Sequence, residues 1–303
     1  MKSVLAVCLS PTFQRMLVFP SFAENEVNRS TQVLEIASGK GINVSRVLNL
    51  LGRPCTNLIQ LGGRRVPEFL DLCLQDGLDV VYLPVEADIR TCTTVINEKD
   101  HTSTELVEEA RTVEENDSDR FFSLFLSLVD SYDAVVIAGT KAEGFSPDIY
   151  PRIVEEAKKR GKMVILDIKG QDLKDALEKS PTVIKPNLSE FTTTFLPDRA
   201  VSENGESEDM KDEVERMLRE IYRKYGTASI ITRGKYDTWC FDGNEFSTVS
   251  NRVVLPVVNT IGCGDTLTAS VTHALLEGMA LKDAVQFGMD NAARKAARLE
   301  QGL

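Results

Sequence analysis

Residues 257–266, Val-Val-Asn-Thr-Ile-Gly-Cys-Gly-Asp-Thr, follow the order apolar segment, glycine turn, helix. The helix is predicted to begin near Asp265. The two glycines allow a tight turn and a close approach of the backbone to a ligand. The backbone N–H groups of such a turn have no partner inside the helix, so they can bind an anion. Taken alone, Asp265 is a helix cap more often than a catalytic base, so the rest of the chain has to decide between these interpretations.

The composition is typical of a soluble globular protein with a large core. The 303 residues are enough for one α/β domain with an insertion, and the hydrophobic (42%) and charged (27%) fractions are ordinary. The formal net charge of −11 argues against a nucleic-acid-binding surface and an anionic membrane partner. No apolar run reaches the length of a membrane span, and the N-terminal apolar stretch lacks a cleavage site. A cytoplasmic protein is therefore predicted.

Cysteine and histidine usage excludes several kinds of site. The six cysteines are scattered and form no C-x-x-C pair, which predicts reduced, buried thiols. The only histidines are His101 and His273. A zinc site or a histidine-based triad is therefore not expected.

Strand and helix patterns alternate along most of the chain, which predicts a mostly parallel sheet with helices on both faces. Strands are predicted at residues 3–9, 56–62, 78–84, 133–139, 162–167, 182–185 and 228–232, with a hairpin at 237–242 and 245–249. Helices are predicted after Ser38 and at 66–76, 118–130, 147–160, 172–179, 209–225, 265–277 and 281–299. Further β-prone stretches are 12–19, 27–36, 90–96 and 104–106. Pro84 is expected to end its strand, and the acidic stretch 197–212 is expected to be a solvated loop.

Glycine and polar turns follow the carboxyl ends of the predicted parallel strands. Ligands of such sheets bind at these ends. The turns in question are residues 139–140, 167–170, 187–190, 232–234 and 262–265. Their convergence on one edge predicts an active site there.

A second glycine turn, Ser-Gly-Lys-Gly-Ile-Asn-Val at 38–44, leads into a helix. It lacks the third glycine of a dinucleotide fingerprint. It is not a Walker A loop either, because Gly41 follows Lys40 where Ser or Thr is required. Two interpretations remain: a plain loop before a helix, or a turn that binds a small ligand through Lys40 and Asn43.

Three motifs together resemble the PfkB, or ribokinase-like, carbohydrate kinases over essentially the whole chain. Residues 38–45 resemble the first family signature, residues 259–265 resemble the second, and residues 185–190 contain the N-x-x-E motif. The resemblance implies an α/β fold with three layers (α/β/α) and a mostly parallel central sheet. It also implies one domain over 1–303, with a small β-sheet lid inserted from about 10–36 and 88–108.

The chain is further similar to the 1-phosphofructokinase and tagatose-6-phosphate kinase branch. Residues 26–29 (Glu-Val-Asn-Arg), residues 39–44 and residues 104–106 carry this similarity. It implies an acceptor sugar that already bears a phosphate. In that branch an arginine at the position of Arg90, with basic residues near Lys40 and Arg29, faces the substrate phosphate, which suits guanidinium chemistry.

The resemblance implies a kinase that uses ATP and Mg²⁺. Asp265 would take the proton of the acceptor hydroxyl, and the backbone N–H groups of Gly262, Cys263 and Gly264 would stabilise the transferring γ-phosphoryl group. Cys263 replaces the usual alanine, but only its N–H is needed. Glu190 would organise magnesium, through water. The implied nucleotide-binding residues are Lys185, Asn187, Thr232, Gly234, Asn259 and Asn291. The implied acceptor-binding residues are Gln14, Arg29, Ser38, Gly39, Lys40, Asn43, Arg90 and Thr140.

The resemblance also implies a homodimer formed through the lid, since pairing would cover open strand edges. Neither nucleic acid nor a membrane is expected as a partner.

Departures from the family pattern concentrate on the acceptor side. Ser-Pro-Thr-Phe-Gln at 10–14 replaces Asn-Pro-x-x-Asp, so that the uncharged Gln14 stands in place of a carboxylate. Ser38 replaces a glycine, and residues 139–142, 167–170 and 233–237 also differ. Lys141 and Lys169 either add positive charge to the site or are surface lysines.

Two alternative functions remain open from the residues. One is a kinase of an unphosphorylated sugar or a nucleoside. The other is a catalytically degenerate family member that binds a sugar phosphate and acts as a sensor or regulatory protein. Intact Asp265 and Glu190 argue against the second alternative.

Overall fold

The computed structural model describes residues 2–201, 208–252 and 254–298. Within them, nine strands form one sheet in the order β13-β12-β11-β10-β9-β8-β1-β4-β5. Its strands are β1 (Val4–Cys8), β4 (Cys55–Gly62), β5 (Asp79–Val85), β8 (Ala134–Ala138), β9 (Met163–Asp167), β10 (Val183–Ile184), β11 (Ala228–Arg233), β12 (Tyr236–Phe241) and β13 (Phe246–Val249). Neighbours from β5 to β11 are parallel, and the β12–β13 hairpin is antiparallel. The predicted mostly parallel sheet is confirmed.

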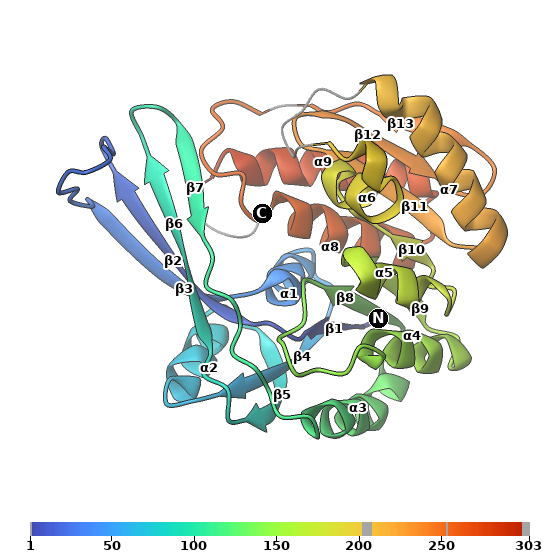
Figure 1. The fold of residues 1–303 in the computed structure, drawn as a ribbon, viewed down its shortest axis with the longest axis horizontal. Helices are drawn as coiled ribbons and strands as arrows, with labels where there is room; N and C mark the ends of the chain where they lie inside the picture. The colour runs from blue at the N-terminus through green and yellow to red at the C-terminus, as the bar shows by residue number, and fades with distance from the viewer. Residues whose placement is uncertain (1, 202–207, 253, 299–303) are drawn as a thin grey trace.

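Helices cover both faces of this sheet, which makes three layers (Figure 1). They are α1 (Lys40–Leu50), α2 (Val66–Gln75), α3 (Asp117–Leu128), α4 (Ile149–Lys159), α5 (Gly170–Leu177), α6 (Leu188–Phe195), α7 (Lys211–Tyr225), α8 (Cys263–Leu276) and α9 (Leu281–Ala296). One apolar core lies under α3 to α7, and another lies under α1, α8 and α9. β1 and β8 are buried along their whole length because both faces are covered. Burial of each Val, Leu or Ile there contributes about 1.5–3 kcal/mol.

A second sheet stands out to one side of these layers (Figure 1). It has the order β3-β2-β6-β7 and is built from β2 (Thr12–Phe19), β3 (Gln32–Ser38), β6 (Arg90–Asn97) and β7 (Thr102–Leu106). Its base packs on α2 through Phe13, whose ring meets that of Phe69 edge-on at 5.2 Å between centroids. These strands come from the two segments expected to form the lid. That the sheet closes over a substrate remains a proposal.

Several element boundaries differ from those expected. Pro84 lies inside β5 and does not end it, because β5 is the edge strand and proline needs no partner on an open edge. Residues 27–31 form a loop, and β3 begins only at Gln32. α8 begins at Cys263, before Asp265, because Gly262 adopts a left-handed φ of 84° that starts the helix earlier. Part of the acidic stretch, 202–207, and the last residue of the expected 281–299 helix lie outside the described residues.

The order in which the chain adds strands to the sheet changes direction at β1, so β1 lies at the topological switch point of the sheet. From β1 the chain adds β4 and β5 on one side, and then β8 to β11 on the other. Ligands of open α/β sheets bind beyond the carboxyl ends of the strands at such a reversal. Asp167 ends β9, and Lys185 and Thr232 lie at the ends of β10 and β11, so these residues share the edge where a ligand is expected.

All six cysteines are free thiols, and five are buried as predicted, whereas Cys263 is half-buried. Among the helices of the described part of the chain, none is long and apolar enough to cross a membrane.

Candidate active site

The glycine turn before α8 leaves room for a ligand beside its N–H groups. Gly262 adopts a φ of 84°, and the helix begins at the next residue. A Cβ placed on Gly264 would meet only one atom within 4 Å, the Nζ of Lys185 at 3.9 Å. Lys185 is itself buried. The turn therefore combines open space, a helix N-terminus and a buried ammonium group, which together favour an anion.

Asp265 lies one residue further along this helix and is buried. One of its carboxylate oxygens, Oδ2, accepts a hydrogen bond from Asn43 Nδ2 at 2.7 Å. Burial raises the pKa of Asp265, while the ammonium of Lys40 lowers it, and the balance places the pKa at about 6. A carboxylate with this pKa is ionised at neutral pH and still basic enough to take a proton.

The orientation of Asn43 is fixed by two donors on its other side. Its Oδ1 accepts from Ser38 Oγ at 3.1 Å and from Arg46 Nη1 at 2.9 Å. The amide oxygen is therefore occupied, and only the NH₂ group can face Asp265. The Arg46 guanidinium is held in turn by Asp76 Oδ2 at 2.7 Å. This chain of contacts joins α1 to α8 at the candidate site.

Close packing of the backbone places the start of α1. Gly39 adopts a φ of 124°, and a Cβ there would lie 2.8 Å from Cys8 Sγ. A Cβ on Gly41 would lie 2.8 Å from Cys8 Cβ. Both positions therefore require glycine, and they bring Lys40, the first residue of α1, to the end of β1.

Two lysines converge on Asp167. Its Oδ1 lies 3.2 Å from Lys40 Nζ, and its Oδ2 lies 3.0 Å from Lys185 Nζ. Thr268 Oγ1 of α8 donates to the same Oδ2 at 2.7 Å. Burial would raise the pKa of Asp167, but the two ammonium groups outweigh it and hold the pKa at about 2. Asp167 therefore stays ionised and fixes two cations at the edge of the sheet.

Asn187 and Glu190 form a capping box at the start of α6. Asn187 Oδ1 accepts from the Glu190 N–H at 2.7 Å, and Glu190 Oε2 accepts from the Asn187 N–H at 3.0 Å. The remaining oxygen, Glu190 Oε1, lies 3.8 Å from Lys40 Nζ. The N-x-x-E motif is thus a helix cap whose free carboxylate oxygen faces the candidate site.

The carboxylates at this edge of the sheet do not form a preformed metal-binding site. Within the described residues, no group of three or more His, Cys, Asp and Glu side chains is close enough to hold a metal ion. Asp167 is taken by two lysines and Asp265 Oδ2 by Asn43, which leaves Glu190 Oε1 and Asp265 Oδ1. Mg²⁺ in phosphoryl-transfer sites keeps several waters and binds one or two carboxylates plus substrate phosphates. The donor set therefore fits a magnesium ion that arrives with a nucleotide.

On the acceptor side, Gln14 and Arg90 have defined partners. Gln14 is buried in β2 and donates from Nε2 to Thr94 Oγ1 at 2.8 Å. Arg90 begins β6 and donates from Nη1 to the Glu108 carbonyl at 2.8 Å and from Nη2 to the Ser10 carbonyl at 3.4 Å. These contacts hold the guanidinium beside the loop that follows β1.

Four further residues considered for the acceptor side make none of the contacts described above. Arg29 is exposed in the loop between β2 and β3, and Thr140 is exposed after β8. Lys141 forms an ion pair with Asp172 in α5, and Lys169 is exposed. Their roles as acceptor-binding residues therefore stay predictions.

The predicted nucleotide-binding residues fall into two groups. Asn187 and Thr232 lie side by side through a parallel bridge, and Gly234 follows in the turn after β11. Asn291 is buried in α9, where its Nδ2 donates to Ser270 Oγ of α8 at 3.1 Å. Asn259 is also buried, and its Oδ1 accepts from the Ile261 N–H at 3.0 Å. In this structure the last two asparagines hold elements together, so nucleotide contact stays a prediction for them.

Sequence reasoning placed Asp167 in a turn of the predicted active site without giving it a role, and it did not single out Thr268, Arg46 or Lys295. Asp167 had a signal, since it directly follows a buried strand. Lys295 also had one, because it continues the apolar stripe of α9 through Ala284 and Gly288 at helical spacing. Arg46 and Thr268 had none, because their roles depend on contacts between distant elements.

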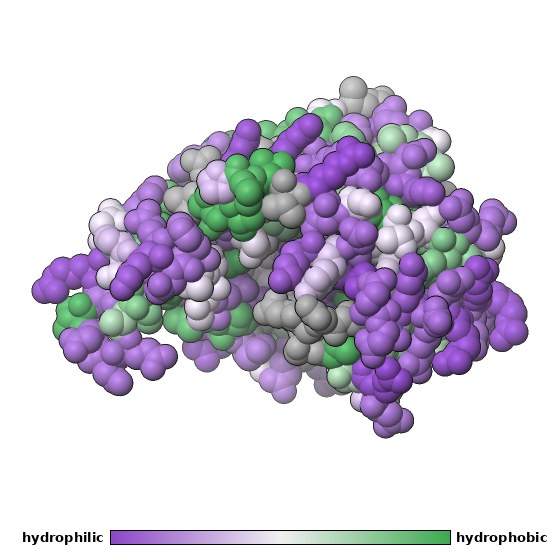
Figure 2. Space-filling model, turned by 90° about the horizontal axis from the view of Figure 1, so that it is seen from above, coloured by the Kyte–Doolittle hydropathy of each residue, from purple (hydrophilic) through white to green (hydrophobic). Residues whose placement is uncertain are grey.

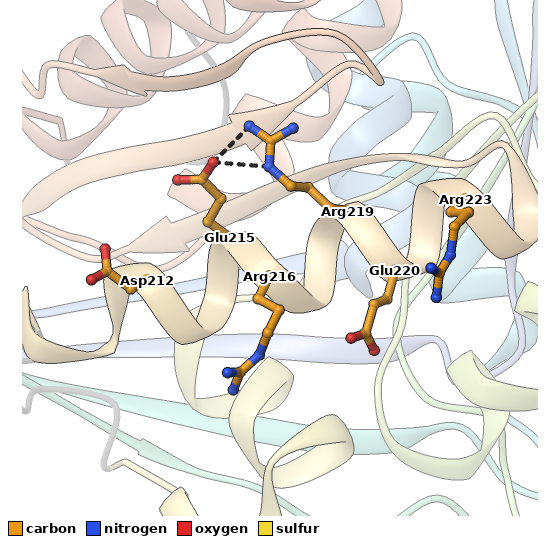
Figure 3. A pocket seen from close by; sticks show the side chains of 6 residues that line it. All are labelled: Asp212, Glu215, Arg216, Arg219, Glu220 and Arg223. Carbon is orange, nitrogen blue, oxygen red and sulfur yellow. Dashed lines mark hydrogen bonds and ion pairs between the residues drawn. The ribbon is translucent and has the colours of Figure 1, made fainter.

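A shallow hollow on α7 lies on another part of the molecule (Figure 3). Six charged side chains line it: Asp212, Glu215, Arg216, Arg219, Glu220 and Arg223. They belong to one helix, and Arg219 pairs with Glu215 four residues earlier at 2.7 Å. This is the solvated face of an amphipathic helix, stabilised by short-range ion pairs.

Comparison with known proteins agrees with the fold. The model of the pfkB family carbohydrate kinases matches residues 9–299. A possible 1-phosphofructokinase from Thermotoga maritima is similar, with 22% identity and a TM-score of 0.88, over 99% of this chain and 95% of that one. Phosphofructokinase-2 from Escherichia coli in complex with fructose-6-phosphate has 21% identity and a TM-score of 0.85, over 98% and 94%. The tetrameric inhibited form of that enzyme has 21% identity and a TM-score of 0.84, over the same shares.

Proposed function

The chain belongs to the pfkB family of carbohydrate kinases, and from this premise we propose that it transfers the γ-phosphoryl group of ATP to a hydroxyl of a phosphorylated ketohexose. The acceptor would be of the fructose 1-phosphate, tagatose 6-phosphate or fructose 6-phosphate type. The single observation that carries the proposal is Asp265, a buried carboxylate with a pKa of about 6 beside a glycine turn with open space and a buried ammonium.

In the proposed reaction, the acceptor hydroxyl gives its proton to the Asp265 carboxylate. The hydroxyl oxygen forms a bond to the γ-phosphorus of ATP, the bond from that phosphorus to the β–γ bridging oxygen breaks, and ADP leaves. The N–H groups at the start of α8 would hold the negative charge of the transferring group, and the Cys263 N–H would exchange its hydrogen bond to the Thr260 carbonyl (3.2 Å) for this contact. Asn43 occupies Oδ2 of Asp265, which leaves Oδ1 for the proton.

Lys185 supplies fixed positive charge on the nucleotide side, and Lys40 supplies it on the acceptor side. Both are anchored by Asp167, so neither has to be ordered when substrate binds. Glu190 would hold Mg²⁺ through water. When bound, this ion neutralises the phosphate charges of ATP. Exposed apolar side chains of the loop before α8 belong to the surface that a planar nucleobase would cover. They are Val254, Leu255, Val257 and Val258. This loop lies at the top of Figure 1, and the face seen from that side in Figure 2 carries a patch of apolar side chains.

A phosphorylated acceptor is favoured by the cations on the acceptor side. Arg90 begins β6 and Lys40 begins α1, and Arg29 lies in the loop between β2 and β3 of the second sheet. A guanidinium can bind a phosphate in a bidentate manner. Gln14 is buried and uncharged, so it adds no negative charge that would repel a phosphate.

The second sheet would act as a lid over the sugar and as a dimer interface. Its outer strands β3 and β7 have open edges. Val33 on β3 and Leu106 on β7 are exposed, with relative exposures of 49% and 56%. Pairing with the same sheet of a second copy would cover these side chains and edges.

An ADP-release assay with matched acceptors tests the proposed function. We expect turnover with at least one of fructose 1-phosphate, tagatose 6-phosphate and fructose 6-phosphate, and none above background with fructose, tagatose or a nucleoside. Turnover of unphosphorylated acceptors alone would show that the phosphate-binding argument is wrong. Thermal stabilisation by sugar phosphates without ADP release from any acceptor would favour the regulatory alternative.

A further inference from the structure

Lys295 is a fully buried cation that the proposed mechanism does not use. It lies near the end of α9 with a relative exposure of 0%. Its Nζ donates to the backbone carbonyl of Asn259 at 3.1 Å, and no described carboxylate lies within 4.0 Å of it. An ammonium buried without a counter-ion destabilises a fold, because it loses its hydration. An apolar side chain at this position would pack without that penalty, so the charge calls for a functional explanation.

The end of α9 that carries Lys295 packs against the segment that leads into the glycine turn. The N–H groups of Val258 and Asn259 both donate to the carbonyl of Ala296, at 2.7 and 3.1 Å. Cys263 Sγ lies 3.5 Å from the Ala292 carbonyl. The last turns of α9 thus contact both the loop before the turn and the first residue of α8.

The charge of Lys295 acts on the same groups that form the candidate site. Burial lowers the pKa of Lys295, and the nearby Cys263 thiol and Asp265 carboxylate act in the opposite direction. Gly288 lets α9 approach α8 closely, since a Cβ there would lie 3.1 Å from Val271 Cγ2. Because α8 and α9 pack closely and Lys295 is fully buried, water does not surround its ammonium, and the electric field of the ammonium is screened less than it would be in water.

We propose that Lys295 is a positioning residue for phosphoryl transfer, a role that rests on the proposed function. Its ammonium supplies fixed positive charge behind the glycine turn, and its hydrogen bond holds the Asn259 carbonyl. The turn, in which the Cys263 N–H donates to the Thr260 carbonyl at 3.2 Å, is then kept in place with the N–H group of Gly264 beside the anion, in an environment that already favours negative charge. Lys295 acts through the turn and touches no reacting atom.

Three variants separate the charge from the hydrogen bond and from a merely structural role. Lys295→Gln keeps an N–H donor but removes the charge, and Lys295→Met removes both. Lys282→Met is the matched control, because Lys282 lies on the same helix but is exposed and pairs with Glu245 at 3.2 Å. If Lys295 acts only through its hydrogen bond, the N–H donor of glutamine can take its place. If it acts through its charge, glutamine cannot.

The experiment measures the affinity for the non-hydrolysable analogue AMP-PNP with Mg²⁺ by calorimetry, and kcat by ADP release. Lys295→Gln and Lys295→Met are expected to weaken binding about tenfold and to lower kcat about tenfold to a hundredfold. Their melting temperature should stay equal or rise, because a buried charge is removed. Lys282→Met should match the wild type. Wild-type binding and kcat in a folded Lys295→Gln would overturn the proposal.

A fourth variant covers the case in which these proteins do not fold. Lys295→Ala leaves a cavity, and added ethylammonium is expected to raise its kcat, with no effect on Lys282→Ala. Absence of this rescue in folded Lys295→Ala would contradict the proposal. Analogue binding needs no acceptor, so a wild type that phosphorylates nothing, yet depends on Lys295 for AMP-PNP affinity, would refute the proposed function and keep only the part of this inference that concerns nucleotide binding at the turn.

Discussion

Two buried aspartates of the candidate site have pKa values shifted in opposite directions. Asp167 lies between two ammonium groups and is held ionised with a pKa of about 2. Asp265 has no ion pair within 4.0 Å among the described side chains, and burial raises its pKa to about 6. Environments that separate the pKa values of neighbouring acids are typical of active sites, where one group anchors and the other exchanges protons. In this chain Asp167 anchors lysines, and we assign proton transfer to Asp265.

The first prediction is a pH profile set by Asp265. Only its ionised form can accept a proton, so kcat/KM should fall about tenfold per pH unit below about 6 and level off above it. Lys40→Met should move this limb to higher pH, because the Lys40 ammonium lowers the pKa of Asp265. The measurement is kcat/KM between pH 4.5 and 8.5 with the best acceptor. A flat profile over this range in both proteins would argue against Asp265 as the base.

At the scale of elements, α6 shows how one motif serves two purposes. The capping box uses Asn187 Oδ1 and Glu190 Oε2 to satisfy backbone N–H groups at the start of the helix. Glu190 Oε1 is left to face Lys40. The motif therefore marks the start of α6 beside the candidate site. From sequence alone, however, a helix cap and a magnesium ligand cannot be told apart.

Glu190→Gln separates these two roles. Glutamine keeps an acceptor for the Asn187 N–H, so the free energy of unfolding should change by less than about 0.5 kcal/mol. The charge that would attract hydrated Mg²⁺ is lost, so the Mg²⁺ concentration for half-maximal activity should rise about tenfold. Asn187→Ala is the complementary variant, and loss of its cap should destabilise the protein by about 1 kcal/mol. If Glu190→Gln has an unchanged Mg²⁺ requirement, Glu190 is only a cap.

The elements were largely predictable, because burial on both faces gives continuous apolar strands such as β1 and β8, and glycines end the helices. Boundaries failed where tertiary position decides. Pro84 is tolerated only because β5 is an edge, and α8 starts early only because Gly262 takes a left-handed φ. The same limit applies to the site. Asn43 and Asp265 lie in recognisable motifs, whereas the Arg46 contact to Asn43 and the Lys295 contact to Asn259 exist only after folding.

At the scale of the whole molecule, the second sheet is the element that a second copy would cover. Its outer strands expose Val33 and Leu106 next to unpaired edges. An exposed strand edge with apolar side chains readily pairs with another chain. The proposed homodimer would use this surface.

Sedimentation velocity tests the dimer. The wild type is expected to sediment as a dimer at micromolar concentration. Val33→Asp combined with Leu106→Asp should give a monomer, because buried unpaired charges destabilise an interface by several kcal/mol. Leu74→Asp is the matched control, since Leu74 is exposed at 76% on α2 and belongs to no strand of the second sheet. A monomeric wild type, or a double variant that still dimerises, would contradict the proposed interface.

The most direct test of the central claim is the kcat of Asp265→Asn with the phosphorylated acceptor that the wild type uses best. Asparagine can still accept the Asn43 hydrogen bond but cannot take a proton. We predict that kcat falls at least about a thousandfold, which is within the range of general-base catalysis. The affinity for AMP-PNP with Mg²⁺, measured on the same protein, should stay within about threefold, because the turn is unchanged. An Asp265→Asn protein that turns over at the wild-type rate would contradict the assignment of Asp265 as the base of a sugar-phosphate kinase.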